Sequence, residues 1–213
     1  MKPTDWRNLS EEWKILLTVS LRFQEAQTPK DEILTVFAKG KEWTAAKVYE
    51  EIHGQAVDYP LWPDNMFLNQ LLQLKDLYAQ HSSIDSIYPL MYFPLLETLY
   101  LNHTDISELD GLILNNGLKQ IYLDHTLIDD ISYLSGMQLE VFSARDSNIT
   151  ELGPLRSQFT LKLIDLRDTP VDSLFMLEEL PHLQVLMLSE KYIDMKQLDN
   201  FRERHPNCDV QLH

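Results

Sequence analysis

An apolar pattern recurs about every 22 residues from residue 74 onward in this chain of 213 residues. Each copy reads L-x-x-L-x-L, followed by an apolar residue five positions after its last member. The copies open at Leu74, Leu96, Leu118, Leu139, Leu161 and Leu183, so the interval is constant apart from one step that is shorter by a single residue. A fixed period of this length predicts a solenoid, in which each repeat buries its apolar face against its neighbours.

The repeated positions stay apolar from copy to copy. The second core position is filled by Leu77, Leu99, Ile121, Phe142, Ile164 and Leu186. The third is filled by Ala79, Leu101, Leu123, Ala144, Leu166 and Leu188, and the later one by Ile84, Ile106, Ile128, Ile149, Val171 and Ile193. These columns predict one continuous core through all the repeats.

The segments LETLYLNHTDISELDGL (Leu96 to Leu112) and LKQIYLDHTLIDDISYL (Leu118 to Leu134) resemble leucine-rich repeats of the 22-residue, internalin-like class. The resemblance covers residues 74–213 and implies an α/β solenoid of about six repeats. Its short parallel strands form the concave face, and 3₁₀ or extended returns form the convex face. Hydroxyl residues, able to bond turn backbone, replace the usual turn Asn of this class: Ser82, Thr104, Thr126, Ser147 and Thr169.

Residues 1–73 contain no repeat, and their apolar spacing predicts helices. We expect helices over residues 11–26, from an N-cap at Thr28 through Ala38, over residues 42–53, and from an Asp64 cap through Leu72. The favoured interpretation is a helical N-terminal cap on the first repeat, and the alternative is a separate partner-binding module. The segment LSEEWK, residues 9–14, also resembles the start of some bacterial leucine-rich repeat proteins.

Residues 194–213 predict a C-terminal cap made of a helix and a strand. A capping box of Asp194 and Gln197 would start the helix, and residues 208–212 alternate as a final strand. Cys208 is the only cysteine, so we interpret it as a small buried core residue in a reducing compartment.

The chain is acidic, with 18 Lys and Arg against 33 Asp and Glu and a net charge of -15. This charge disfavours nucleic acid and anionic membranes and would steer a basic protein partner toward the chain. We find no apolar run of membrane-spanning length, and Met1 to Arg7 lack the layout of a signal peptide. These observations predict a cytoplasmic protein.

Residues between the core leucines should point to the concave face and form columns, because strand side chains alternate. The columns predict an exposed docking strip for a partner, made of Tyr78, Tyr100, Tyr122, His81, His103, His125, Asn102, Asp124, Arg145 and Arg167. The alternative is that repeat duplication copied the tyrosines and histidines into register without a binding role.

Three histidines in one column could hold a metal ion or respond to pH. We favour a pH-dependent surface between about pH 5 and 7, because the nearby carboxylates Asp124 and Asp146 do not obviously converge on an ion. For Arg145 and Arg167 we favour ion pairs with neighbouring aspartates over an anion clamp.

The sequence as a whole predicts non-catalytic protein recognition through the concave face, without a cofactor, a metal or catalytic residues. A first alternative is an adaptor that binds through its N-terminal helices, with the solenoid as scaffold. A second, less favoured, is a metal-dependent hydrolase. The oligomeric state stays open.

Overall fold

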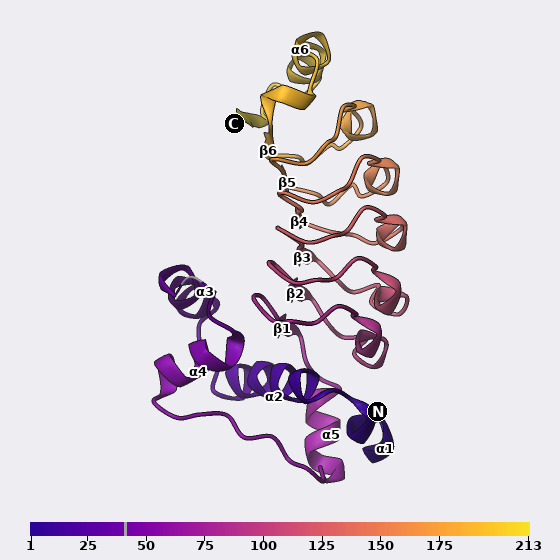
Figure 1. The fold of residues 1–213 in the computed structure, drawn as a ribbon. Helices are drawn as coiled ribbons and strands as arrows, with labels where there is room; N and C mark the ends of the chain where they lie inside the picture. Colours follow the sequence, from indigo (N-terminus) through magenta and orange to yellow (C-terminus); the bar gives the residue numbers. More distant parts are fainter. Residues whose placement is uncertain (41) are drawn as a thin grey trace.

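The computed structural model describes residues 1–40 and 42–213 and shows a curved stack of repeats with helices at both ends (Figure 1). The helices are α1 (Pro3–Asn8), α2 (Glu11–Glu25), α3 (Lys30–Lys39), α4 (Ala45–His53), α5 (Asn65–Leu71) and α6 (Met195–Arg204). The strands are β1 (Asp76–Tyr78), β2 (Thr98–Tyr100), β3 (Gln120–Tyr122), β4 (Val141–Ser143), β5 (Leu163–Leu166), β6 (Val185–Leu188) and β7 (Asp209–Leu212).

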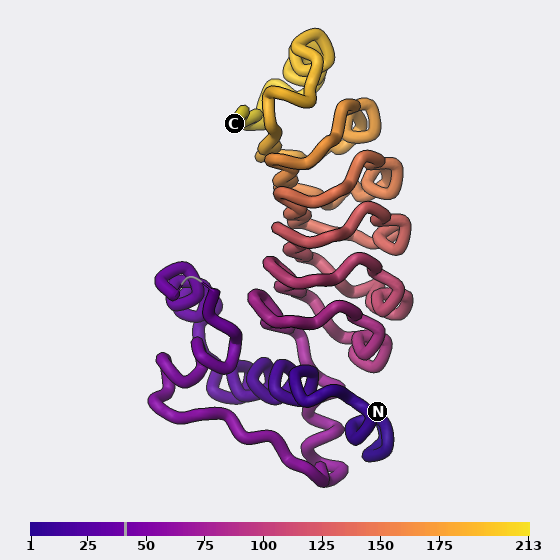
Figure 2. The backbone as a smooth tube through the Cα atoms, viewed as in Figure 1, coloured from indigo at the N-terminus to yellow at the C-terminus, as the bar shows by residue number. Residues whose placement is uncertain are grey.

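The seven strands form one parallel sheet in chain order, and the tube drawing in Figure 2 shows the two termini at opposite ends of the molecule. Equivalent residues of successive repeats pair directly, as Leu77 with Leu99 and Leu99 with Ile121. The returns on the convex side are short 3₁₀ helices at Tyr88–Tyr92, Asp110–Leu112, Ser132–Leu134, Gly153–Leu155 and Phe175–Leu177. This is the α/β leucine-rich repeat solenoid that the sequence predicts.

The core is continuous along the solenoid. The leucines that open the repeats and the second and third core positions are all buried, most of them completely. The shortened step between Leu118 and Leu139 does not disturb the sheet, because β3 and β4 keep the register Ile121 to Phe142. The missing residue is therefore absorbed outside the strands.

The turn hydroxyls bond mostly within their own turn. Ser82, Thr104, Thr126 and Ser147 each donate to the carbonyl oxygen three residues earlier, at 2.6 to 2.8 Å. Only Thr169 reaches the preceding repeat, where it donates to the carbonyl oxygen of Ala144 at 2.7 Å. These buried hydroxyls give the carbonyl groups at the ends of the strands a hydrogen-bond partner.

Side chains of α2 satisfy backbone groups at the outer edge of β1. Ser20 Oγ accepts from the Tyr78 amide at 3.1 Å, and the Gln24 side chain bonds the Lys75 amide and the Gln73 carbonyl. An unpaired strand edge would leave these groups without partners. Helix α2 therefore closes the first repeat with specific hydrogen bonds as well as with apolar contacts.

The predicted helices are present, with shifted boundaries. Ser10 and Asp64 cap α2 and α5 through their side chains, at 3.2 and 2.8 Å from the amides of Trp13 and Phe67. The predicted N-cap at Thr28 is wrong, because Pro29 occupies that position before α3. Helix α1 was not predicted.

The predicted C-terminal helix and strand are α6 and β7, but the capping box is wrong. Asp194 is the N-cap of α6 without a side-chain bond. Gln197 instead bonds the backbone of the previous repeat, donating to the carbonyl oxygen of Asp172 at 3.1 Å. Cys208 is half-buried against the core rather than fully buried.

No helix in the described part of the chain has the length and apolar character needed to cross a membrane.

Replacing Leu101 with Ala should lower the free energy of unfolding by about 2 to 5 kcal/mol, because this fully buried side chain leaves a cavity between repeats. Urea unfolding followed by circular dichroism measures the change. The exposed leucine Leu127 provides a matched control, since Leu127→Ala should change stability by no more than about 0.5 kcal/mol. Equal losses in both variants would contradict this assignment of the core.

Candidate concave recognition surface

The parallel register places the predicted columns side by side on the concave face. Tyr78 pairs with Tyr100 and Tyr100 with Tyr122. Their rings stack with centroids 5.1 and 4.8 Å apart and planes within about 11° of parallel. The stacked tyrosines follow the spacing of the strands, which lie about 4.8 Å apart.

The tyrosine column is largely covered, which corrects the prediction of an exposed strip. Tyr78 is 2% exposed and Tyr100 is 4% exposed, while Tyr122 is half-buried. Burial raises the pKa of the Tyr78 and Tyr100 hydroxyls well above the ordinary range. In this conformation only Tyr122 can contact a partner.

Helix α2 lies across the open end of the first repeat, and α3 stands on the concave side of the first repeats (Figure 1). The ring of Phe23 in α2 lies 5.5 Å from that of Tyr78. At the start of α3, Lys30 Nζ lies 2.6 Å from Asp76 Oδ1 and 3.3 Å from Thr98 Oγ1. The helices thus occupy the part of the concave face where the tyrosines begin.

A hollow of about 300 Å³ lies between α3 and the sheet. Leu34 and Phe37 of α3 form one wall, and Tyr100, Tyr122 and His103 lie on the sheet side. This volume is at the small end of the range for ligand pockets, so it suits a single side chain better than a cofactor.

The histidine column forms a second stack. The ring centroids of His81 and His103 are 4.4 Å apart and those of His103 and His125 are 4.2 Å apart. All three residues have a left-handed backbone with φ between 56° and 59°. Asp146 and Asp168, at the same place in later repeats, are also left-handed, with φ of 52° and 57°. His and Asp tolerate this conformation better than most residues, so the turn itself accounts for part of the column.

The electrostatics disfavour protonation of two members of the stack, His81 and His103. Burial, together with the neighbouring imidazoles, lowers the pKa of His103, and burial also lowers the pKa of His81. His125 Nδ1 lies 2.8 Å from Asp146 Oδ2 at the end of the column. Among the described residues no three His, Cys, Asp or Glu side chains are arranged to hold a metal ion.

Asn102 and Asp124 hold the turns in place. Asn102 Oδ1 accepts from the Asp124 amide at 3.0 Å, and Asp124 Oδ1 accepts from the Arg145 amide at 3.0 Å. The Ser143 hydroxyl also donates to Asp124. Burial raises the pKa of the Asp124 carboxyl. Because this carboxyl accepts hydrogen bonds from Ser143 and Arg145, it stabilises the turns of the repeats.

The two arginines form ion pairs, as favoured from the sequence. Arg167 makes a bidentate pair with the buried carboxylate of Asp165, at 2.9 Å from Nε and 2.6 Å from Nη2. The more exposed Arg145 lies 3.4 Å from Asp168. Both guanidinium groups therefore already have carboxylate partners.

An apolar strip on β4, β5 and β6 was absent from the predicted site. It consists of half-buried side chains on the open concave face: Val141, Leu163, Val185 and Met187. The signal was present in the sequence, because the column of Asp76, Thr98 and Gln120 in the first three repeats becomes apolar at Val141, Leu163 and Val185. Met187 belongs to the tyrosine column.

Charged residues border the strip on both sides. Before the strands, lysines and glutamates of neighbouring repeats alternate: Lys75 and Lys119 bond Glu97 at 2.6 and 2.8 Å, and Lys162 bonds Glu140 at 2.6 Å. The two lysines lower the pKa of the Glu97 carboxyl to about 2. The opposite border carries three exposed acidic side chains, Asp146, Asp168 and Glu190.

Three solved structures are similar to this chain. A leucine-rich repeat protein from Leptospira interrogans matches with a TM-score of 0.62 and 19% identity over 70% of this chain and 40% of its own. The Listeria monocytogenes internalin InlF matches with a TM-score of 0.55 and 20% identity, over 86% of this chain and 54% of its own. The functional domain of InlJ, from the same species, matches with a TM-score of 0.53 and 18% identity, over 68% of this chain and 31% of its own. The chain thus spans about half of these proteins or less.

This likeness shows the fold, which is an internalin-like leucine-rich repeat solenoid. Neither a family model nor a curated protein sequence matches the chain.

The histidine stack predicts a fall in stability on mild acidification. Because the pKa values of His81 and His103 are lowered on folding, the unfolded chain binds more protons below its own histidine pKa of about 6.5. The free energy of unfolding should therefore decrease as pH falls from about 7 to 5.5. His103→Asn should reduce this slope, measured by urea unfolding at several pH values.

The control for this slope is His182→Asn, which alters an exposed histidine before β6. An unchanged slope in His103→Asn, or the same reduction in both variants, would show that the stack does not set the pH dependence.

Proposed function

Starting from an internalin-like leucine-rich repeat fold, we propose that the chain is a non-catalytic recognition protein that binds a protein partner on the open concave face from β3 to β7. The observation that carries the proposal is the apolar strip of Val141, Leu163, Val185 and Met187, whose half-buried side chains lie on the neighbouring strands β4, β5 and β6. Partly exposed apolar side chains gathered on one face are typical of protein-binding surfaces. Tyr122, beside the hollow under α3, adds an aromatic anchor.

The border of the strip supports a basic partner. Glu190 is exposed along one side beside Asp146 and Asp168, whose carboxylates pair with His125 and Arg145, and the chain as a whole has a net charge of -15. Opposite charges on a partner would raise the rate of association and fix its orientation on the strip. Of the residues predicted from the sequence, we propose that Tyr122, His103, His125, Arg145 and Arg167 contact the partner together with the strip. We assign Tyr78, Tyr100 and Asn102 to the structural framework of the repeats.

Several observations support a non-catalytic role over a hydrolase. Burial raises the pKa of the Cys208 thiol to about 11, so it is a poor nucleophile at neutral pH. The arginines are neutralised by Asp165 and Asp168, and the hollow under α3 is open and small. We also propose a cytoplasmic location, with which a single cysteine and no disulfide agree.

The N-terminal helices act as a cap in this proposal, in preference to a separate adaptor module. The cap assignment is supported by Ser20 and Gln24 of α2, which bond the backbone of β1 and of Lys75 just before it. It is also supported by Lys30 of α3, which bonds side chains of β1 and β2. A module joined only by a linker would leave β1 exposed.

The recognition surface is tested with two concave variants, Tyr122→Ala and Leu163→Ala. For a protein captured by the wild type and then purified, each change should raise the Kd about tenfold, equivalent to about 1 to 2 kcal/mol, because each removes an anchor. Isothermal titration calorimetry measures the Kd.

The matched controls are Tyr133→Ala and Leu127→Ala, which remove exposed side chains outside the strands. They should leave the Kd unchanged. If the control variants raise the Kd as much as the concave variants do, or if neither concave variant raises it, recognition by the concave face is contradicted.

Deleting residues 1–73 tests the cap. Because the deletion exposes the edge of β1 and the rings of Tyr78 and Tyr100, fragment 74–213 should lose its cooperative unfolding transition or aggregate. Circular dichroism and size-exclusion chromatography measure this. A folded, monomeric fragment that no longer binds the partner would instead support the adaptor alternative.

A further inference from the structure

The segment from Gly54 to Asp64 links α4 to α5 and carries the most exposed large apolar side chains of the described chain. Leu61 is 71% exposed, Trp62 is 74% exposed, and Met66, at the start of α5, is 69% exposed. Scattered exposed apolar residues are common on protein surfaces, but three large ones within six positions form a patch that requires an explanation.

This segment is held firmly despite its exposure. Trp6 Nε1 donates to the carbonyl oxygen of Pro60 at 2.9 Å, and the Tyr59 hydroxyl donates to Glu11 Oε1 at 2.9 Å. Pro60 and Pro63 flank Leu61 and Trp62 and fix two backbone angles. The exposed side chains are therefore presented from an ordered backbone, which lowers the entropy lost on binding.

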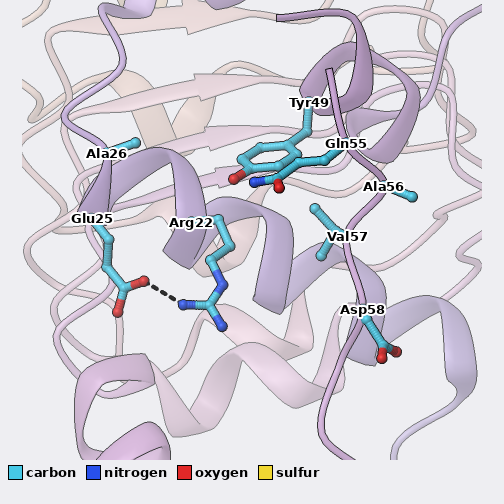
Figure 3. A pocket seen from close by; sticks show the side chains of 8 residues that line it. All are labelled: Arg22, Glu25, Ala26, Tyr49, Gln55, Ala56, Val57 and Asp58. Atoms are coloured by element: carbon cyan, nitrogen blue, oxygen red, sulfur yellow. Dashed lines mark hydrogen bonds and ion pairs between the residues drawn. The ribbon is translucent and has the colours of Figure 1, made fainter. Parts of the chain in front are cut away.

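A groove runs between this segment and α2. Two hollows, of about 520 and 450 Å³, share Arg22, Glu25 and Asp58 along their common border. Figure 3 shows the first hollow, with Arg22 and Glu25 of α2 at one side, Val57 and Asp58 of the segment at the other, and Tyr49 of α4 between them at the top. The second continues past Tyr59 to Trp62, Met66 and Phe67.

The charges around the groove are mainly negative. Arg22 is paired with Glu25 at 2.7 Å, as Figure 3 shows, so these two cancel. Asp58, Asp64 and Glu11 remain near the groove. The cations nearby are Arg7, whose guanidinium carbon lies 5.0 Å from the Trp62 ring centre, and Lys14, whose Nζ donates to the Arg7 carbonyl oxygen at 3.4 Å. The Trp62 ring thus already accepts a cation on its face.

We propose that this groove is a second docking surface, which binds a basic segment of a partner protein bearing large apolar side chains. Trp62, Leu61 and Met66 supply the apolar contact, since tryptophan is over-represented among the residues that dominate binding energy. Asp58 and Asp64 supply charge complementarity to lysine or arginine. The surface is separate from the concave strip, so the chain can contact two partners, or two parts of one partner, at the same time.

The test uses the full chain and a phage-displayed library of short random peptides. Selected peptides should be rich in Lys or Arg and in aromatic or large aliphatic residues. Synthetic copies should bind Trp62→Ala about tenfold or more weakly than the wild type by fluorescence anisotropy. Asp58→Asn should also weaken binding and should reduce its dependence on salt, because it removes a carboxylate from the groove.

Two control variants make the result specific to the groove. Phe175→Ala removes an aromatic side chain of comparable exposure, 60%, on the convex side and should not change peptide binding. Tyr122→Ala should also leave it unchanged, which separates this surface from the concave face. The proposal would be overturned if Trp62→Ala bound the selected peptides as tightly as the wild type does. It would also be overturned if the peptides that depend on Trp62 were rich in acidic residues. Thermal unfolding confirms that each variant is folded.

Discussion

In-register hydrogen bonding between parallel strands is the constraint on which the rest of this molecule depends. It fixes the distance between repeats at about 4.8 Å, and whatever occupies equal positions must stack at that distance. The tyrosine and histidine rings do so, with centroids 4.2 to 5.1 Å apart. The lysines and glutamates of the strand approaches obey the same spacing by alternating in sign. The spacing of the strands thus explains the stacking in the surface columns without any reference to a binding partner.

The same hydrogen bonding creates a problem at each end, where a strand has only one neighbour. At the N-terminal end, Ser20 and Gln24 of α2 meet the backbone at and before β1, and α3 continues from there over the concave face. Closing the end therefore removes Tyr78 and Tyr100 from solvent. The open part of the concave face is shifted toward β3 to β7, where Val141, Leu163 and Val185 continue the column that Asp76, Thr98 and Gln120 begin.

The repeats were predictable because their signal is local: a fixed period specifies the strands, the core and the columns at once. Burial of the tyrosines was not predictable from the period, because it depends on contacts such as Lys30 with Asp76 and Thr98, which are 46 and 68 residues apart in the chain. The left-handed turns were missed for another reason. The histidine column was interpreted through its side-chain chemistry, although His and Asp in one register also indicate a backbone conformation. The short helix α1 spans only Pro3–Asn8, too few positions for a periodic signal.

The left-handed turn at the end of the strands limits how this surface can diversify. His81, His103, His125, Asp146 and Asp168 all occupy it, and β-branched or bulky apolar residues there would carry a conformational penalty. One border of the concave face is therefore restricted to small polar or ionisable side chains, whatever the partner. A change of partner preference in such a repeat array would have to arise in the strand columns, where Tyr122, Leu163 and Met187 stand, while this border stays a hydrogen-bonding and charge-bearing margin.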